Sequence, residues 1–510
     1  MSLGFVVGES KPTSVTAITS RSLSVGEYIK ISIDEGEILG LVERSSVSSA
    51  AFTDVKNFHE AEESIEIADI NKRDKTFTAH IGILGFLKNL RKGQSIIPAI
   101  PPIPGTEITQ PTNEDLEEIF SPKKEGWLKI GNLLRNEKIE AKINLDKIVS
   151  RHLGILAMTG MGKSNLVSLI TKKISEVKGT VIIFDYHNDY TTLNIPNVNV
   201  IDAKINPRLL EADQFSEVLE IRENADVQQR VLRMSFTQEV KEAGEFWNKL
   251  EYEVDLLVNS EDKKLKEIRT SAYRVQDIIE DAQRRFDDIL DPEVGNPMDY
   301  IKEGCTNIIN ISELSEKQAN VAMGFYLQQL LKDRKNATIA KHGKSKKQKD
   351  YKFFEPVFII LEEAHVFIPK DHDTAAKYWA AKIAREGRKF GVGLAIVSQR
   401  PRSVDLNILS QMGSFAIMKI IQEDDQRQIA SATESTSREL ISQLTSLNVG
   451  DAVLVGQWTN LPSMVHVEEV KEKKMGADQS ATKAWIKADK MKNVAVESTQ
   501  GLVQKDLLLD

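Results

Sequence analysis

A short glycine-containing segment of the chain has the residues of a phosphate-binding loop. It runs from Ala157 to Ser164, Ala-Met-Thr-Gly-Met-Gly-Lys-Ser, between the apolar run 153–156 and a segment, 165–170, with helical spacing. Glycines let the backbone turn so that its N–H groups point at phosphate oxygens, and a helix N-terminus adds partial positive charge. The pattern usually begins with glycine, and Ala157 is the smallest departure from it. We therefore expect a nucleoside triphosphate to bind here.

The residues of this loop suggest individual roles. Lys163 is expected to reach the β- and γ-phosphates, and the hydroxyl of Ser164 is expected to bind Mg²⁺. The predicted nucleotide-binding set is Thr159, Gly160, Met161, Gly162, Lys163, Ser164, Asn165 and, just before the loop, Arg151.

Carboxylates follow two apolar runs that are typical of buried parallel strands. The run 357–361 ends at Glu362 and Glu363, and the run 181–184 ends at Asp185. We assign Glu362 to Mg²⁺, directly or through water, and Glu363 to the base that orients the attacking water. Asp185 could support the metal-bound water or Glu363, since parallel sheets bind ligands at the carboxyl ends of their strands. A helix N-cap is an equally weighted role for Asp185.

An amide and several arginines complete the candidate chemistry. Gln399 follows the apolar run 392–397 and could sense the γ-phosphate through a neutral hydrogen bond. An arginine supplied by a neighbouring subunit could stabilise the charge that develops on the phosphate. Arg388 is the first choice, with Arg385 and Arg151 as further candidates. The alternative for each arginine is an ordinary surface ion pair.

The overall composition is that of a globular protein with more than one domain. The chain has 510 residues, of which 41% are hydrophobic and 28% charged, with a net charge of −8. The acidic balance argues against a surface covered with nucleic-acid-binding charge but leaves room for a local basic channel. Cys305 is the single cysteine, so no internal disulfide can form, which favours a reducing compartment. No apolar run approaches the ~20 residues of a membrane helix, so we expect a cytoplasmic protein without membrane attachment of its own.

Hydrophobic periodicity divides the chain into segments. Short alternating strands over 1–145 predict a small β-barrel, and strand-helix alternation over 146–206 and 293–470 predicts an α/β core with a parallel sheet. The range 207–292 has helical spacing and is predicted to be a helical insertion in that core. The tail 471–510 is expected to dock on a neighbouring subunit. The lysine-rich stretch 337–351 is expected to be a solvated loop, with DNA contact as the less favoured reading.

Several motifs together resemble the HerA family of archaeal DNA-repair translocases, within the HerA/FtsK superfamily. The resemblance covers most of the chain, and the motifs that carry it are Thr159–Ser164, Phe184-Asp185, Leu361–His365 and Ser398–Pro401. It implies a RecA-like, phosphate-loop ATPase core in a hexameric ring, with an N-terminal barrel of the HAS type that helps to assemble the ring and to dock a nuclease. It also implies ATP- and Mg²⁺-dependent pumping of double-stranded DNA through the pore. The partner would be a NurA-type nuclease that resects broken ends in double-strand break repair by homologous recombination.

On this resemblance, two loops are expected to touch DNA. One follows Glu363 and contains Lys370 and His372, and the other follows Gln399 and contains Arg402. Two alternatives stay open. One is a conjugation-type coupling ATPase or a packaging motor, the former being less favoured because the sequence shows no membrane helix. The other is a non-motor ATPase whose nucleotide state regulates a partner.

Overall fold

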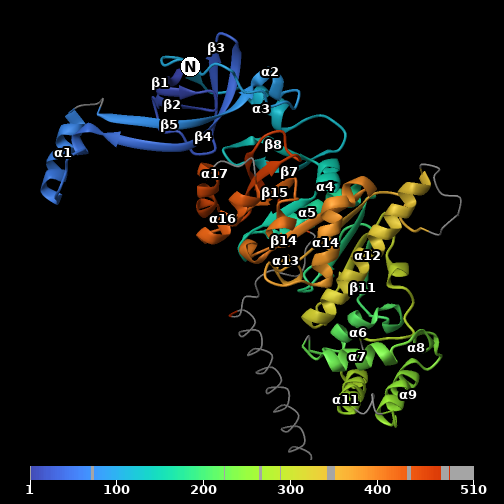
Figure 1. Ribbon diagram of the computed structural model, residues 1–510. Helices are drawn as coiled ribbons and strands as arrows, with labels where there is room; N and C mark the ends of the chain where they lie inside the picture. The colour runs from blue at the N-terminus through green and yellow to red at the C-terminus, as the bar shows by residue number, and fades with distance from the viewer. Residues whose placement is uncertain are drawn as a thin grey trace, which may run out of the picture.

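The chain folds into a barrel and a larger sheet flanked by helices (Figure 1). The computed structural model describes residues 2–70, 74–222, 224–262, 267–287, 289–341, 351–433, 438–471 and 482. The predicted fold class is confirmed: an α/β core carries an N-terminal barrel and a group of inserted helices. Within the described residues no helix is both long enough and apolar enough to span a membrane.

Six strands close the barrel, and their side chains alternate between its interior and solvent. Around the barrel these strands are β1 (Ser2–Lys11), β2 (Ser14–Thr19), β5 (Lys75–Phe86), β4 (Gly36–Ser49), β3 (Tyr28–Ile33) and β6 (Glu107–Thr109). The interior is filled by aliphatic side chains such as Val6, Ala17, Ile29 and Ile31, none of which is exposed. Strands of alternating pattern therefore form a closed sheet, as the periodicity predicts.

The barrel carries an arm that the sequence did not predict. The outer halves of β4 and β5 stay paired from Arg44–His80 to Ser49–Lys75 and lead to η1 (Ala50–Phe52) and α1 (Phe58–Ile70). Figure 1 shows this ribbon and α1 extending away from the rest of the molecule. The arm was missed because a strand of 14 residues exceeds the usual size, and β4 changes from a continuously buried run, Ile38–Val42, to a mostly exposed outer half.

The expected boundary of the barrel at residue 145 needs correction. β7 (Trp127–Leu133) and β8 (Asn136–Asn144) form a hairpin in the larger sheet, where β7 pairs with β17 (Ser463–Val467). α2 (Leu87–Leu90) lies between β5 and β6, and α3 (Asn113–Phe120) lies between β6 and β7. The alternating pattern of β8 suits an antiparallel strand of either sheet. β8 belongs to the larger sheet because its partner β7 pairs with β17, more than 300 residues later. Local periodicity does not report such a distant pairing.

The larger sheet has 11 strands. Their order is β11 (Val198–Asp202), β12 (Thr306–Asn310), β10 (Thr180–Asp185), β13 (Val357–Leu361), β14 (Val392–Ser398), β9 (Leu153–Leu156), β15 (Ser414–Ile417), β16 (Asp451–Gly456), β17, β7 and β8. In this spatial order, the first seven strands, from β11 to β15, run parallel to one another. The remaining pairs, from β15–β16 to β7–β8, are antiparallel. Every residue of β9, β10, β13 and β14 is buried, as in a sheet covered on both faces.

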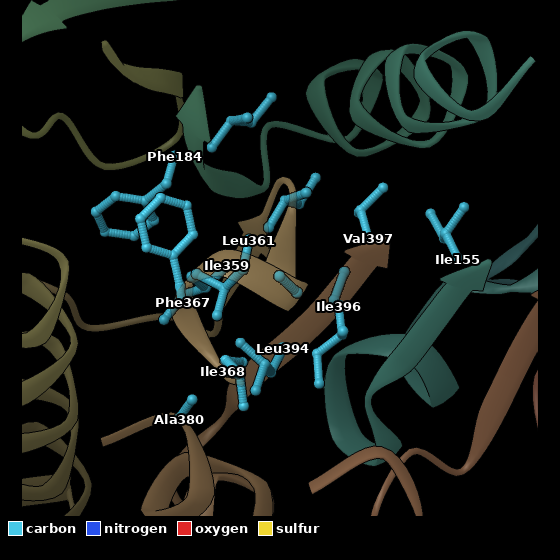
Figure 2. Packing of buried hydrophobic residues seen from close by; sticks show 14 of the residues in the cluster. Ile155, Phe184, Ile359, Leu361, Phe367, Ile368, Ala380, Leu394, Ile396 and Val397 are labelled. Carbon is cyan, nitrogen blue, oxygen red and sulfur yellow. The ribbon is translucent and has the colours of Figure 1, made fainter. Parts of the chain in front are cut away.

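Helices connect the strands of this sheet. They are α4 (Leu145–Arg151), α5 (Lys163–Glu176), α12 (Glu316–Lys341), α13 (Ala364–Phe367), α14 (Ala375–Glu386), η4 (Gly387–Phe390), η5 (Pro401–Ser403), α15 (Leu406–Leu409), α16 (Glu423–Ala432), α17 (Arg438–Ser442) and η6 (Gln443–Ser446). Figure 2 shows part of the core, where side chains of β9, β10, β13 and β14 pack with Phe367 and Ile368. This packing fixes the ends of the four strands relative to one another.

Helices also fill the predicted insertion 207–292, which contains no strand among its described residues. They are η2 (Pro207–Leu209), α6 (Ala212–Val218), α7 (Asp226–Ser235), α8 (Gln238–Glu242), α9 (Phe246–Val258) and α11 (Arg269–Arg285), and η3 (Pro297–Tyr300) follows. Within the lysine-rich stretch, α12 continues to Lys341, so its first residues are helical rather than a loop, and 342–350 lie outside the described residues. The tail beyond 471 lies almost entirely outside them as well.

Candidate nucleotide-hydrolysis site

The chemistry-bearing residues of the sequence meet at one edge of the larger sheet. β10, β13, β14 and β9 are neighbours and run parallel, so the residues at and just after their carboxyl ends lie side by side. These residues are Asp185, Glu362, Glu363, Gln399 and the loop Ala157–Ser164; we call this region the carboxyl edge. Segments up to 240 residues apart in the chain are brought together in this way.

The loop 157–164 has the backbone that its glycines predict. Gly160 and Gly162 have φ angles of 78° and 101°, in the left-handed region where side chains other than glycine are strained. Gly162 is the N-cap of α5, so the first N–H groups of that helix face the loop. Ala157 is fully buried, and its N–H donates to the carbonyl of Ser398 at 3.2 Å. Alanine at the first position is therefore compatible with the loop.

Glu363 is held by the lysine of the loop. The Nζ of Lys163 lies 2.9 Å from Oε1 of Glu363, and the two side chains are 10% and 6% exposed. Nδ1 of His365 lies 3.1 Å from the other oxygen, Oε2. Burial alone would raise the pKa of Glu363, but the contact with His365 and the charge of Lys163 outweigh it and lower the pKa to about 2. The predicted base is therefore ionised at neutral pH.

The backbone of Glu363 is also unusual. Its φ and ψ are 47° and 44°, a left-handed conformation for a residue with a long side chain. Such a conformation costs on the order of 1–3 kcal/mol and occurs where the surrounding structure imposes it, often at functional sites. Here it turns the chain sharply between the buried strand β13 and the short helix α13. Because of this turn, the carboxylates of two successive residues, Glu362 and Glu363, both lie at the carboxyl edge, where they contact Tyr190 and Lys163.

Glu362 has the opposite electrostatic environment from Glu363. It is buried, and its carboxylate accepts a hydrogen bond from the hydroxyl of Tyr190. Burial raises the pKa of Glu362 to about 7, although the charge of Lys163 acts in the other direction. The pKa of Glu362 thus lies above the ordinary value of a glutamate, and the pKa of the adjacent Glu363 lies below it. Such a difference gives two neighbouring carboxyl groups different chemical roles.

Asp185 shapes the loop that follows β10. Its carboxylate accepts the N–H groups of Asp189 at 2.9 Å and of Tyr190 at 2.8 Å, and burial raises its pKa. These bonds direct Asp189 toward Ser164, whose hydroxyl donates to Oδ2 of Asp189 at 3.3 Å. Asp185 therefore acts through Asp189 and Tyr190.

The oxygen atoms around Ser164 fit a magnesium ion that is shared with phosphates. Tyr190 contacts both Glu362 and Ser164, so the hydroxyl and the carboxylate lie within one side chain of each other. No group of three or more His, Cys, Asp or Glu side chains in the described ranges could hold a metal alone. Magnesium typically takes one or two carboxylates and completes its octahedron with water and phosphate oxygens. Ser164, Asp189 and Glu362 supply a donor set of this kind.

Gln399 and His365 connect the end of β14 to the rest of the site. The carboxamide oxygen of Gln399 accepts a hydrogen bond from the hydroxyl of Thr159 in the phosphate loop. Nδ1 of His365 lies 3.3 Å from the hydroxyl oxygen of Ser398, the last residue of β14. Gln399 is thus in contact with the phosphate loop.

Asn165 departs from its predicted place. Its side-chain nitrogen donates to the carbonyl of Glu468 at 2.9 Å, and its oxygen accepts the N–H of Val470 at 2.8 Å. Both ends of the carboxamide therefore hold the segment after β17, and the side chain is engaged away from the phosphate loop. Met161, another residue of the predicted set, uses its backbone carbonyl to accept the N–H of Gly450 at 3.1 Å.

The candidate arginines lie at the opposite edge of the sheet. Arg151 ends α4 just before β9, and Arg388 lies in η4 just before β14. We call this region, with His152, the amino edge. β14 has seven residues, so the two edges are about 20 Å apart at ~3.3 Å per residue. Neither arginine forms an ion pair within the described part of the chain, whereas Arg385 lines a surface cavity with Asp373 and Asp405.

The residues expected to touch DNA lie on two adjoining loops. Pro369 and Val404 form an isolated antiparallel bridge, and the N–H of Lys370 donates to the carbonyl of Ser403 at 3.0 Å. Lys370, His372 and Arg402 are exposed. A cavity of about 750 Å³ is lined by His372, by Glu363, His365 and Gln399 of the carboxyl edge, and by α6 and α7 of the insertion.

Four residues of this site had no predicted role: Asp189, Tyr190, His187 and His365. The first three follow β10 within five residues, so proximity to Asp185 at a strand end was a usable signal. His187 is 55% exposed, with Nε2 at 3.8 Å from Oε1 of Glu363. His365 directly follows the Glu-Glu-Ala segment, which was noted only as a motif.

Comparison with known proteins gives consistent matches. The family model described as "Helicase HerA, central domain" matches residues 128–330, beginning inside β7. The DNA double-strand break repair helicase HerA of Sulfolobus acidocaldarius is 35% identical over 96% of this chain and 97% of its own length. The corresponding protein of Sulfurisphaera tokodaii is 37% identical, with the same coverage. A probable helicase of Methanocaldococcus jannaschii is 34% identical over 95% of this chain and 94% of its own length.

Proposed function

This chain belongs to the HerA family of DNA double-strand break repair helicases, and on that basis we propose that it is an ATP-driven motor that translocates along double-stranded DNA. One observation carries the proposal. A phosphate loop, an ionised glutamate held by the loop lysine and an amide in contact with the loop meet at one edge of a parallel sheet. That arrangement contains the groups that nucleoside triphosphate hydrolysis requires.

The side chains of the carboxyl edge have distinct roles in this proposal. Lys163 leaves Glu363 to bind the β- and γ-phosphates, and Glu363 then orients the attacking water. Gln399 senses the γ-phosphate, while the hydroxyl of Thr159 donates a hydrogen bond to the carboxamide oxygen of Gln399. Mg²⁺, when bound by Ser164 and Glu362 with Asp189 nearby, neutralises charge on the phosphates. Burial keeps Glu362 neutral over part of the physiological range, so its ionisation accompanies metal binding.

We further propose that the site is completed by a second copy of the chain in a hexameric ring. Arg388 and Arg151 are about 20 Å from the phosphate loop of their own chain. An arginine at the amino edge can therefore reach a γ-phosphate only across a subunit boundary. Arg388 is the preferred residue because it is exposed and forms no ion pair among the described residues.

The adjoining loops at Lys370 and Arg402 supply the proposed contact with the DNA backbone. Each loop continues from a strand end that carries Glu363 or Gln399, and the bridge between Pro369 and Val404 joins them. A change at the nucleotide would thus move both loops together. In the cell this motor would act in the cytoplasm with a NurA-type nuclease to resect broken DNA ends, with the barrel as the docking platform.

The test is steady-state ATP hydrolysis with and without blunt-ended linear duplex DNA, at one stated moderate salt concentration because phosphate contacts are strongly screened. Strong stimulation by the duplex is expected for a motor. Turnover that ignores duplex DNA, also in the presence of the nuclease, would contradict the proposal and favour a regulatory ATPase. Sedimentation of the protein with and without nucleotide tests the hexamer separately.

A further inference from the structure

His365 occupies a position between the two strand ends that the proposed chemistry uses. Its Nδ1 lies 3.1 Å from Oε2 of Glu363 and 3.3 Å from Oγ of Ser398, and its side chain is 13% exposed. We propose that His365 is a positioning residue, which fixes the orientation of the Glu363 carboxylate and ties it to the strand that carries Gln399. This inference rests on the proposed role of Glu363 as the base that orients water.

The two oxygens of Glu363 have different partners, and the difference matters once nucleotide binds. Oε1 accepts a hydrogen bond from Nζ of Lys163 at 2.9 Å, whereas Oε2 is buried without a well-aligned hydrogen bond among the described residues and has Nδ1 of His365 at 3.1 Å. When Lys163 turns to the phosphates, Oε1 loses that partner while Oε2 keeps His365. The carboxylate is then held by one oxygen and presents the other to the cavity of about 750 Å³ that Glu363 lines. Without His365, the side chain of Glu363 could change its χ1 or χ2 rotamer, and the carboxylate could turn about its last torsion.

The second contact of His365 links the base to the sensor. Ser398 is fully buried, and its hydroxyl oxygen accepts the N–H of Arg400 at 3.0 Å. The next residue, Gln399, accepts a hydrogen bond from Thr159 of the phosphate loop. A closed chain of contacts therefore runs from Lys163 through Glu363, His365 and the end of β14 back to Thr159. A shift at the γ-phosphate reaches the base from both directions.

The geometry identifies substitutions that separate positioning from bulk packing. Asparagine places a donor nitrogen on Cγ, where histidine carries Nδ1, so His365→Asn can keep the contact with Oε2. His365→Ala removes the donor. His59 lies on the exposed α1 of the arm, with its side chain 82% exposed, so His59→Ala is a matched control far from the site.

The experiment measures kcat with duplex DNA, binding of a fluorescent ATP analogue and the melting temperature, all on the full-length protein. We expect His365→Ala to lower kcat about 10- to 100-fold, the usual cost of losing a group that orients a functional residue. Analogue affinity should change little, because His365 does not face the phosphate loop. His365→Asn should recover most of kcat, and His59→Ala should match the wild type.

Two results would overturn the proposal. One is a kcat in His365→Ala close to the wild-type value, and the other is a folded His365→Asn that is as slow as His365→Ala. If His365→Ala does not fold, the asparagine variant decides alone by the same criterion. Normal turnover in Glu363→Gln would instead refute the assignment of the base. That outcome is distinguishable, because it removes the proposed function of Glu363 rather than the support given to it.

Discussion

The two edges of the larger sheet differ in how complete they are within one chain. At the carboxyl edge every charged group has a partner: Lys163 meets Glu363, Glu362 meets Tyr190, and Asp185 meets two backbone N–H groups. At the amino edge Arg151 and Arg388 have no ion pair among the described residues. Burial lowers the pKa of His152, between them and the core, to about 4, so the arginines provide the charge there.

This difference supports the proposal that the copies of the chain in a ring divide the chemistry between them. Buried charges must be paired or neutral, so the carboxyl edge needs its internal ion pair whenever phosphates are absent. At the amino edge Arg388 is exposed and Arg151 is partly exposed, and an unpaired arginine in contact with water costs little. In the proposed ring, the carboxyl edge would be neutralised within its own chain before phosphates bind, and the amino edge would supply an arginine to a neighbouring copy.

The largest expected effect is that of Arg388 on turnover. Arg388→Ala should lower DNA-stimulated ATP hydrolysis about 10³- to 10⁵-fold, the range known for arginines that act on a transferring phosphoryl group. Binding of a fluorescent ATP analogue should persist, because the phosphate loop is intact. The neighbouring exposed residue offers a matched control, and Lys389→Ala should hydrolyse ATP near the wild-type rate.

Mixing variants tests whether Arg388 acts between subunits. Arg388→Ala keeps the carboxyl edge and Glu363→Gln keeps the amino edge, so an interface between them contains one complete site. Activity should appear on mixing the two inactive proteins. If the mixture stays inactive, while Arg151→Ala mixed with Glu363→Gln recovers, the arginine supplied in trans is Arg151.

The second effect separates the two members of the buried ion pair. Glu363→Gln should lower turnover about 10²- to 10⁴-fold, the usual contribution of a general base, while ATP remains bound. Lys163→Ala should in addition weaken nucleotide binding about 10- to 100-fold, since a hydrogen bond to a charged group is worth about 1.5–3 kcal/mol. Single-turnover hydrolysis and analogue titration measure the two. Equal loss of affinity in both variants would contradict the assignment of Glu363 as the base.

Much of the carboxyl edge could be predicted because its signals are local. A glycine loop between strand and helix, and carboxylates directly after apolar runs, identify Lys163, Glu362 and Glu363 without knowledge of distant contacts. Parallel strands then force these residues to one edge. Gln399 was found by the same reasoning, and the structure places it in contact with Thr159.

What the sequence left out depends on contacts between distant segments. The side chain of Asn165 is engaged by a backbone segment 303 residues away, a contact that its place after the phosphate loop does not reveal. β8 alternates as a barrel strand would, yet it pairs with β7, which pairs with β17 in the larger sheet. Tyr190 and Asp189 follow a strand by several residues, and only the hydrogen bonds of Asp185 fold them back to the site.

The third prediction concerns stability without nucleotide, where the adjacent glutamates should behave oppositely. The folded-state pKa of Glu362 is raised from 4.5 to about 7, so its ionisation destabilises the fold as pH rises above 4.5. Glu362→Gln should therefore be more stable than wild type at pH 8, by up to ~3 kcal/mol at 1.36 kcal/mol per pKa unit, and equal to it below pH 4.5.

Glu363→Gln should show the reverse sign. The folded-state pKa of Glu363 is lowered to about 2, so the ionised carboxylate stabilises the fold above pH 4.5, and this contribution is lost as pH falls toward 2. The variant should be less stable than wild type at pH 8 by about 1–3 kcal/mol. Thermal unfolding across pH 4–8.5 measures both variants. The same sign for the two would show that their environments are not as different as the structure indicates.

The smallest effect tests whether Asn165 belongs to the nucleotide site or to its support. Its two hydrogen bonds attach the segment after β17 to the first turn of α5. Asn165→Ala should lower the free energy of unfolding by about 1–3 kcal/mol, since each bond contributes about 0.5–1.5 kcal/mol. Affinity for the ATP analogue should be unchanged. A variant that bound the analogue as weakly as Lys163→Ala would place Asn165 among the ligands, and the first turn of α5 would then contribute side chains beyond Lys163 and Ser164.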